Sequence, residues 1–389
     1  MYERHIQKEL LELAQSYPVV TVTGPRQSGK TTLVRLTFPH LPYVNLEAPD
    51  MQDMVRADPR GFLNQYKEGV ILDEIQRVPF LLSFLQPLVD EKKQLGKFIL
   101  TGSHQLELQQ AITQSLAGRT ALLTLLPLSL AELEQANIKL NLDEHMLSGG
   151  YPRIFHDKQD PTKAYRNYFQ TYVERDLRQL IQVKDLNQYQ QFVRLCAGRI
   201  GQLLNLESIG NEIGVSANTV KSWVSILEAS YIIFRLHPYH DNFGKRTIKS
   251  PKIYFYDLGL ATYLLGIENT IQLSRDPLRG NLVENLVVLE LLKARLNRGF
   301  DSHLYFYRDS QGHEVDILFQ VGRDLVSIEV KSSQTFNSDF LKNLNQFSSV
   351  IGQRFLKGYL VYAGEQETKV KNIQLLNYVN ASRAVTESL

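Results

Sequence analysis

Residues 24–32 combine glycines, a lysine and two threonines in the order expected of a loop that binds phosphate. They read GPRQSGKTT and match the pattern G-x-x-x-x-G-K-[ST]. In such a loop backbone N–H groups point at the phosphates, Lys30 reaches the β- and γ-phosphates, and Thr31 ligates Mg²⁺. We therefore predict nucleotide contacts from nine consecutive residues, namely Gly24, Pro25, Arg26, Gln27, Ser28, Gly29, Lys30, Thr31 and Thr32. The alternative is a glycine-rich turn with an accidental Lys-Thr pair.

The elements around this loop support the prediction. Residues 18–23 are typical of a buried strand that runs into the loop, and residues 31–36 are typical of a helix that leaves it. The N-terminus of that helix adds a dipole that favours an anion.

Two carboxylates follow an apolar run at residues 69–76. Such a run indicates a buried parallel strand, and Asp73 and Glu74 come at its carboxyl end, where open α/β sheets bind ligands. Asp73 is expected to hold Mg²⁺ through water, and Glu74 to orient or deprotonate the attacking water. Two solvated acids at a strand end are the alternative.

Four further positions are candidates for contacts with the nucleotide. A third strand over residues 97–104 should lie beside the phosphate-loop strand, so that Ser103 or His104 could sense the γ-phosphate. Arg119 is a candidate arginine finger, acting in its own chain or in a neighbouring subunit, and Arg153 is a candidate nucleotide sensor on a lid. Arginine suits both roles because negative charge accumulates on phosphoryl oxygens in the transition state. Each arginine could equally be an ordinary surface residue.

A helix-turn-helix is predicted over residues 206–224. An apolar-periodic helix ends at Gly214, and a second helix begins after Ser216, which caps it. In DNA-binding domains the exposed face of the second helix enters the major groove. The predicted DNA contacts on that face are Asn218, Lys221 and Ser222.

A basic stretch at residues 235–249 interleaves cations with aromatic residues. This combination suits phosphate contacts and base stacking, and we predict that Lys245 and Arg246 contact DNA. The apolar run at residues 231–234 is expected to form the first strand of a winged helix's β-ribbon. The alternative is a winged domain used only for packing or for contacts with a protein partner.

Acids and a lysine near the C-terminal end suit a metal-dependent nuclease. Asp316 lies on one predicted strand, and Glu329 and Lys331 lie on the next, two residues apart and therefore on one face. Asp316 and Glu329 are expected to hold Mg²⁺ or Mn²⁺, with Glu284 of an upstream amphipathic helix as a further ligand. Lys331 would position the nucleophilic water or stabilise the developing charge. The alternative is a hairpin whose acid and lysine form an exposed cross-strand pair.

The composition is that of an ordinary globular protein. The chain has 389 residues, 43% hydrophobic and 22% charged, which suggests two to four domains. The single cysteine, Cys196, excludes an internal disulfide and favours a reducing compartment, so we expect a cytoplasmic location. We expect no signal peptide and no membrane span. The net charge of +2 does not indicate whether the protein binds nucleic acid.

With these residues in place, the chain resembles the bacterial and archaeal AAA-type ATPases that carry a C-terminal DUF4143 domain. The motifs that carry the resemblance extend over nearly the whole chain and are GPRQSGKTT, ILDEIQ, LTGSHQ, SLAGR, PLSLAEL, GGYPR, YVERD, YFYDLGLA and EVDIL followed by IEVKSS. The resemblance implies an ATP-binding domain, a winged helix and a restriction-endonuclease-like domain of the PD-(D/E)xK class.

The expected fold class is therefore α/β. A P-loop NTPase sheet of the AAA type (residues 1–130) precedes a helical lid (131–185), a winged helix-turn-helix (186–250) and a mixed α/β nuclease-like domain (251–389). We expect an ATP-hydrolysing DNA-binding protein, with nuclease activity gated by the nucleotide. The alternative is an ATP-dependent switch whose nuclease-like domain is inert and binds DNA or a protein partner. The expected cofactors are ATP and Mg²⁺, with Mn²⁺ possible at the nuclease-like site, and Arg119 acting in trans would require a homo-oligomer.

Overall fold

The computed structural model describes residues 2–92, 94–103, 105–173, 186–239 and 249–388. The chain forms two compact units. Unit 1 consists of Met1–Leu128, Ala229–Tyr231 and Leu296–Phe300, and unit 2 consists of Ser129–Glu228, Ile232–Arg295 and Asp301–Leu389.

Unit 1 is built on a five-stranded parallel sheet. Its strands are β1 (Val19–Thr23), β2 (Tyr43–Asn45), β3 (Val70–Asp73), β4 (Phe98–Gly102) and β5 (Thr120–Thr124). Their order across the sheet is β2-β3-β4-β1-β5, so β4 lies between β1 and β3. The prediction that the third strand lies beside the phosphate-loop strand is confirmed, because Thr23 of β1 pairs with Gly102 of β4.

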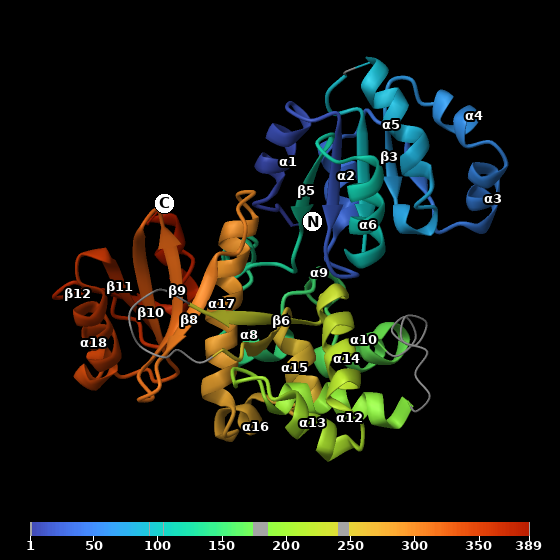
Figure 1. The fold of residues 1–389 in the computed structure, drawn as a ribbon. Helices are drawn as coiled ribbons and strands as arrows, with labels where there is room; N and C mark the ends of the chain where they lie inside the picture. The colour runs from blue at the N-terminus through green and yellow to red at the C-terminus, as the bar shows by residue number, and fades with distance from the viewer. Residues whose placement is uncertain (1, 93, 104, 174–185, 240–248, 389) are drawn as a thin grey trace. The chain divides into compact units, whose positions relative to one another are not determined.

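Apolar side chains cover both faces of this sheet. Leu72 and Leu100 belong to one hydrophobic cluster, whereas their neighbours Ile71 and Ile99 belong to another. The first cluster draws on α5 and the second on α2, so the sheet is enclosed between helices, as its continuous apolar runs predict. The helices of unit 1 are α1 (Gln7–Ala14), α2 (Lys30–Thr37), α3 (Pro49–Ala57), α4 (Pro59–Asn64), α5 (Leu81–Lys92) and α6 (Gln105–Ser115). Figure 1 shows β3 and β5 of this sheet with α1, α2, α5 and α6 around them.

Helices and a mixed sheet make up unit 2. From residue 130 onward the described helices are α7 (Leu130–Gln135), α8 (Leu142–Ser148), α9 (Pro152–His156), α10 (Pro161–Tyr168), α12 (Leu186–Gly198), α13 (Leu206–Ile213), α14 (Ala217–Ala229), α15 (Leu258–Leu264), α16 (Thr270–Arg275), α17 (Arg279–Leu296), α18 (Lys342–Ile351) and α19 (Arg383–Thr386). The strands are β6 (Ile233–Pro238), β7 (Lys252–Phe255), β8 (Leu304–Arg308), β9 (Glu314–Val321), β10 (Asp324–Lys331), β11 (Phe355–Tyr362), β12 (Lys369–Val370) and β13 (Ile373–Asn377).

All eight of these strands belong to one sheet, in the order β12-β13-β11-β10-β9-β8-β6-β7. β9 and β10 form the predicted hairpin, whereas β10 and β11 run parallel. The predicted β-ribbon forms between β6 and β7, and β6 also pairs with β8. β6 and β7 are therefore continuous with the sheet that carries Asp316 and Glu329.

The helix α17 differs from its prediction. We expected an amphipathic helix, but its side chains are buried almost without interruption from Leu282 to Lys293. A helix whose residues are buried on all sides is enclosed by its surroundings and does not lie on a surface. Glu284 consequently projects from an element in the interior of unit 2.

The predicted pair of helices is present at α13 and α14. Gly214 ends α13 with a φ of 73°, and the hydroxyl of Ser216 accepts a hydrogen bond from the Thr219 N–H at 3.1 Å. Trp223 is only 5% exposed and packs against Tyr189 and Phe192. Trp223 therefore belongs to the core of the helix pair.

Asp257 joins two motifs that are far apart in the sequence. Its buried carboxylate accepts hydrogen bonds from the Gly150 N–H at 2.8 Å and from the Leu260 N–H, at the start of α15, at 3.1 Å. A Cβ added to Gly149, whose φ is 61°, would lie 2.1 Å from the Tyr165 hydroxyl. Close packing within unit 2 thus explains part of two sequence motifs, GGYPR at residues 149–153 and YFYDLGLA at residues 254–261.

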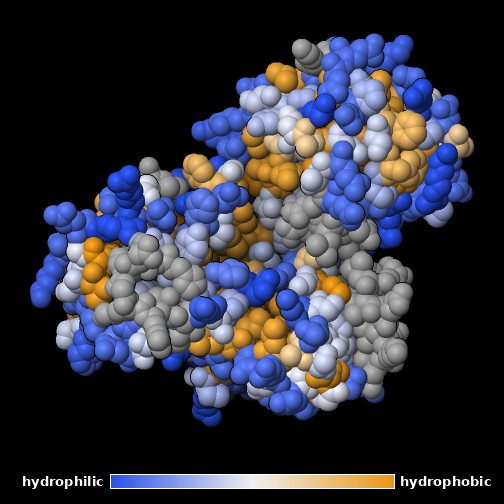
Figure 2. All heavy atoms as spheres, viewed as in Figure 1, coloured by the Kyte–Doolittle hydropathy of each residue, from blue (hydrophilic) through white to orange (hydrophobic). Residues whose placement is uncertain are grey.

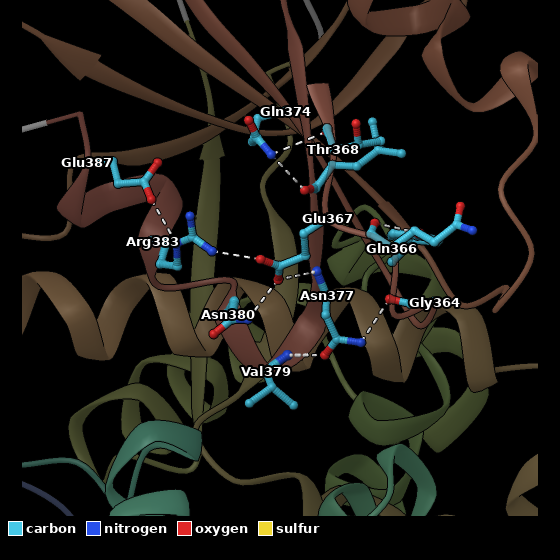
Figure 3. A network of polar contacts seen from close by, with 12 residues as sticks. Gly364, Gln366, Glu367, Thr368, Gln374, Asn377, Val379, Asn380, Arg383 and Glu387 are labelled. Atoms are coloured by element: carbon cyan, nitrogen blue, oxygen red, sulfur yellow. Dashed lines mark hydrogen bonds and ion pairs between the residues drawn. The ribbon is translucent and has the colours of Figure 1, made fainter. Parts of the chain in front are cut away.

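The C-terminal segment is held by a polar network around Glu367 (Figure 3). Glu367 accepts hydrogen bonds from the Asn377 N–H at 3.0 Å and from the Asn380 side chain at 2.7 Å, and it pairs with Arg383 at 2.6 Å. This network ties α19 to the loop that follows β11.

No described helix combines the length and the apolar character needed to cross a membrane. On the face of the molecule in Figure 2, apolar residues occur in groups among hydrophilic ones.

Replacing Asp257 by alanine should destabilise unit 2 by about 3 kcal/mol, because two buried N–H donors lose their acceptor. The exposed N-terminal cap Asp160, which accepts one hydrogen bond from the Lys163 N–H at 2.9 Å, is the matched control. Asp160→Ala should cost only about 1 kcal/mol. Urea unfolding followed by the fluorescence of Trp223, the one tryptophan of the chain, measures both variants. Equal effects would contradict the buried role of Asp257.

Candidate functional site

The phosphate loop depends on two glycines in unusual backbone conformations. Gly24 has a φ of 140°, and a Cβ built there would lie 2.1 Å from the Leu125 carbonyl oxygen. Gly29 has a φ of 94° and immediately precedes α2. The chain therefore turns from the end of β1 into a helix N-terminus, which is the arrangement that binds phosphate groups.

Lys30 points back into this loop. Its side chain is 5% exposed, and its Nζ donates to the carbonyl oxygens of Gly24 at 3.0 Å and Pro25 at 2.8 Å. Burial lowers its pKa to about 8, although Glu74 and Asp73 oppose this shift. A phosphate oxygen would offer the same ammonium an anionic acceptor, which suits the role predicted for Lys30.

Three hydroxyl groups converge on Asp73 at the end of β3. Thr31 Oγ1 lies 3.0 Å from Asp73 Oδ2, and the Tyr43 hydroxyl donates to the same oxygen at 2.7 Å. Thr101 of β4 donates to Oδ1. The structure thus brings Thr31 and Asp73 together as predicted, and their oxygens fit an Mg²⁺ ion, which prefers hydroxyl, carboxylate and water ligands.

Glu74 lies beside this group in a left-handed backbone conformation, with a φ of 58°. Its N–H donates to Thr101 Oγ1 at 3.3 Å, and its carboxylate accepts hydrogen bonds from Gln76 and, at 3.3 Å, from Ser103. Ser103 is fully buried at the end of β4. Ser103 therefore lies beside Glu74, and both this contact and that of Gln76 are ones that the sequence reasoning missed.

Arg4 is a second residue that the sequence reasoning missed. Its guanidinium is buried and donates to the Ser28 carbonyl oxygen at 2.7 Å and to the Leu126 carbonyl oxygen at 2.6 Å. It thereby fastens the phosphate loop to the segment after β5. No motif signals this role, because Arg4 is 24 residues away from Ser28.

Arg119 does not lie at the phosphate loop of its own chain. It precedes β5 and its carbonyl oxygen accepts from the Val19 N–H, whereas the loop begins after Thr23. Four residues of strand separate the two ends, or about 13 Å. The guanidinium also forms a two-point ion pair with Asp90, at 2.6 and 2.8 Å. Within its own chain Arg119 therefore lies at the edge of the parallel sheet opposite to the phosphate loop, and its role as a finger stays a prediction.

The remaining predicted residues are placed as follows. Arg153 lies on α9 of unit 2, is largely exposed and pairs with Asp157 at 2.9 Å. Asn218, Lys221 and Ser222 lie on the exposed face of α14. His104, Lys245 and Arg246 lie outside the described residues.

The four residues of the nuclease-like prediction belong to one acidic centre in unit 2. Asp316 accepts a hydrogen bond from the Val330 N–H at 2.8 Å, which holds it against the end of β10. Glu329 accepts from Lys331 at 2.7 Å and from Asn343 of α18 at 3.1 Å. Burial, with repulsion from Asp316 as the next cause, raises the pKa of both Glu329 and Glu284. Asp316 is thus close enough to act on both glutamates.

Lys252 enters the same centre from β7, and the sequence reasoning did not include it. Its Nζ lies 2.9 Å from Glu284 Oε1 and 2.5 Å from Glu314 Oε1. Tyr254 also donates to Glu284. Although burial alone would lower the pKa of Lys252, the carboxylates of Glu284, Asp316 and Glu314 raise it above its usual value.

These acids do not fit a divalent metal as they are arranged. Within the part of the chain that the structure describes, no group of three or more His, Cys, Asp or Glu residues is arranged to hold a metal ion. Glu284 is paired with Lys252, and Glu329 with Lys331. The predicted carboxylates therefore lie near one another, but the ammonium groups of Lys252 and Lys331 form ion pairs with two of them.

Three family models match successive parts of the chain. One described as an AAA domain matches residues 16–134, which contain the phosphate loop and both acids. A domain of unknown function, DUF8612, matches residues 139–271, and another, DUF4143, matches residues 279–381. The fold and the site thus define a P-loop ATPase of the AAA class, a fold that supports ATP binding and hydrolysis.

Relatives extend over most of the chain. Uncharacterized protein Rv2008c of Mycobacterium tuberculosis is 32% identical over 352 residues, which are 90% of this chain and 77% of that protein. Uncharacterized protein MJ1637 of Methanocaldococcus jannaschii is 23% identical over 420 residues, covering 92% of this chain and 85% of that protein. The chain belongs to the family of AAA-type ATPases that carry a C-terminal DUF4143 domain.

The matches among solved structures are more distant. A Walker-type ATPase of Pyrococcus abyssi has a TM-score of 0.48 and 15% identity, covering 68% of this chain and 96% of that chain. AMPPCP-bound DnaA from Aquifex aeolicus has a TM-score of 0.28 and 16% identity, covering 57% of this chain and 85% of that chain.

Glu74→Gln should lower kcat for ATP hydrolysis by about 10²- to 10⁴-fold and leave ATP binding intact, because the amide cannot accept a proton from water. Steady-state turnover and the affinity for a fluorescent ATP analogue measure the two effects. Glu68→Gln, which alters a surface ion pair with Lys97 of the same unit, is the control and should be neutral. Full turnover of Glu74→Gln would remove the role predicted for Glu74.

Arg4→Met should raise KM for ATP about tenfold with a smaller change in kcat, because the phosphate loop loses a charge-assisted hydrogen bond at Ser28 and its link to Leu126. Arg4→Lys keeps the charge and should fall between the variant and the wild type. Arg56→Met removes an exposed arginine of unit 1 and controls for charge. A loss of stability without any change in KM would show that Arg4 is only structural.

Proposed function

We propose that this protein is an ATP-hydrolysing molecular switch that binds DNA. The proposed ATP hydrolysis rests on one observation, the convergence of Lys30, Thr31, Asp73 and Glu74 at the carboxyl edge of one parallel sheet. The proposed DNA binding depends on the exposed face of α14 and on the basic stretch after β6.

The residues of unit 1 would divide the work of hydrolysis among them. Backbone N–H groups of the loop and the ammonium of Lys30 would hold the β- and γ-phosphates, and Thr31 and Asp73 would hold Mg²⁺. The metal neutralises charge on the phosphate oxygens when it is bound. Glu74 would orient the attacking water and accept its proton, since its carboxylate lies next to the metal-binding pair.

The contacts of Glu74 suggest how the nucleotide could be sensed. Ser103 and Gln76 both donate to the Glu74 carboxylate, and Gln76 also lies 3.3 Å from Ser103. A water that donates to the Glu74 carboxylate would therefore release these two side chains, whose N–H and O–H groups could then donate to a γ-phosphate. Ser103 directly follows β4, so this change would be transmitted along the strand between β1 and β3. An arginine finger from Arg119 would require a second copy of the chain.

The charged residues on α13 and α14 determine how these two helices could bind DNA. The described charges on α13 and α14 are Glu207, Glu212, Lys221 and Glu228, so Lys221 is the one cation there. Arg199 pairs with Glu212, and Arg235 pairs with Glu228. Phosphate attraction would thus depend on Lys221 together with Lys245 and Arg246. The alternative partner for this face is another protein.

Cleavage of DNA gated by the nucleotide is the second candidate function. The proximity of Glu284, Asp316, Glu329 and Lys331 favours it, because these are the residue types that metal-dependent nucleases use. The pairing of the acids with lysines counts against it, since the ligands of a divalent metal must be available to that metal.

Lys221→Ala combined with Lys245→Ala should weaken DNA binding and reduce the slope of log K against log salt by about 2, one for each lost phosphate contact. Fluorescence anisotropy with a labelled duplex, at several salt concentrations and with ATP analogue or ADP, measures both. Lys342→Ala, at an exposed lysine of α18, is the control. An unchanged slope would favour the protein-binding alternative, and equal affinity in both nucleotide states would contradict a switch.

A further inference from the structure

The acidic centre of unit 2 contains a buried lysine that the nuclease-like pattern does not require. Lys252 is 3% exposed, and its ammonium contacts carboxylates from two other elements, Glu284 of α17 and Glu314 of β9. The ring of Phe306 lies 5.4 Å from the ammonium, on the apolar side of the centre. The position of the charge is therefore determined by contacts on several sides.

The charges in this centre are nearly balanced without a metal. The carboxylates are Glu284, Glu314, Asp316 and Glu329, and the cations next to them are Lys252, Lys331 and Arg308. Arg308 lies 3.4 Å from Glu314, which is thus shared between two cations. A buried carboxylate requires a counter-charge, and here side chains of the chain itself supply it.

A divalent ion would compete directly with Lys252. The ammonium and a metal would both bind the Glu284 carboxylate, whose Oε1 accepts from Lys252 and from Tyr254. Two cations at hydrogen-bond distance from one buried oxygen repel each other strongly at low dielectric. The hydroxyl groups around Asp73 in unit 1 present no such obstacle, because a hydroxyl carries no net charge.

We infer that Lys252 occupies the place of a divalent cation, so that this centre is a metal-free ion network that joins β7, α17 and β9 and does not cleave phosphodiesters. The inference concerns unit 2 alone and stands independently of the proposed switch. It also implies a latent metal site, which should open when Lys252 is removed.

The first test is a titration of the full-length protein with Mn²⁺ in the absence of nucleotide, followed by electron paramagnetic resonance. The wild type should bind no Mn²⁺ at this centre. Lys252→Met keeps the length of the side chain and removes its charge, and it should bind Mn²⁺ at least about tenfold more tightly. Lys252→Arg keeps the charge and should behave as the wild type. Mn²⁺ binding by the wild type that is lost in Asp316→Asn would overturn the inference.

A second measurement covers the case in which Lys252→Met folds poorly. Its Tm should fall, and Mn²⁺ should raise it again, because the metal replaces the missing charge. The double variant Lys252→Met with Glu284→Gln removes both partners and should recover part of the lost Tm. A Tm for Lys252→Met that equals that of the wild type, with no response to Mn²⁺, would show that the charge is not needed.

Cleavage assays complete the test. The wild type should leave single-stranded, duplex, forked and four-way-junction DNA intact with Mg²⁺ or Mn²⁺, with or without ATP. Cleavage by the wild type that is absent in Lys331→Ala would overturn the inference. ATP turnover of Lys252→Met should equal that of the wild type, so the result for unit 2 can be distinguished from a failure of the ATPase.

Discussion

The parallel alignment of five strands determines where the chemistry of unit 1 can occur. All five strands end at one edge, and that edge receives the phosphate loop from β1, Asp73 from β3 and Ser103 after β4. Because β4 lies between β1 and β3, Thr101 can contact both Asp73 and the backbone of Glu74. The same alignment places Arg119 at the opposite edge, where its partner is Asp90.

The two units contain acidic groups of similar chemistry with different neighbours. Asp73 is surrounded by the hydroxyl groups of Thr31, Tyr43 and Thr101, which an incoming metal can share or displace at little electrostatic cost. Glu284 is paired with the ammonium of Lys252, which repels any further cation. The donor that faces a buried carboxylate, and not the carboxylate itself, therefore distinguishes the metal site that we propose at Asp73 from the ion network that we infer around Glu284.

Membership of the family describes the architecture better than the roles of individual motifs. GGYPR contains Arg153, a predicted nucleotide sensor, but Gly149 and Gly150 serve the packing of Tyr165 and Asp257. Asp257 also caps α15, within the motif YFYDLGLA. A motif that characterises the family can thus be explained by close approach of backbone and buried carboxylate, without any contact with a ligand.

The sequence by itself determined the elements whose signals are local. The strand, loop and helix around Gly24–Thr32, the acids at the end of β3, the cap at Ser216 and the hairpin of β9 and β10 all follow from residue types and spacing. Only the tertiary structure decided which distant groups meet. Arg4 reaches Ser28, Lys252 reaches Glu284, and α17 is enclosed on all sides because separate segments pack around them. Such contacts depend on the strand order and on burial, and a single sequence carries no local pattern for either.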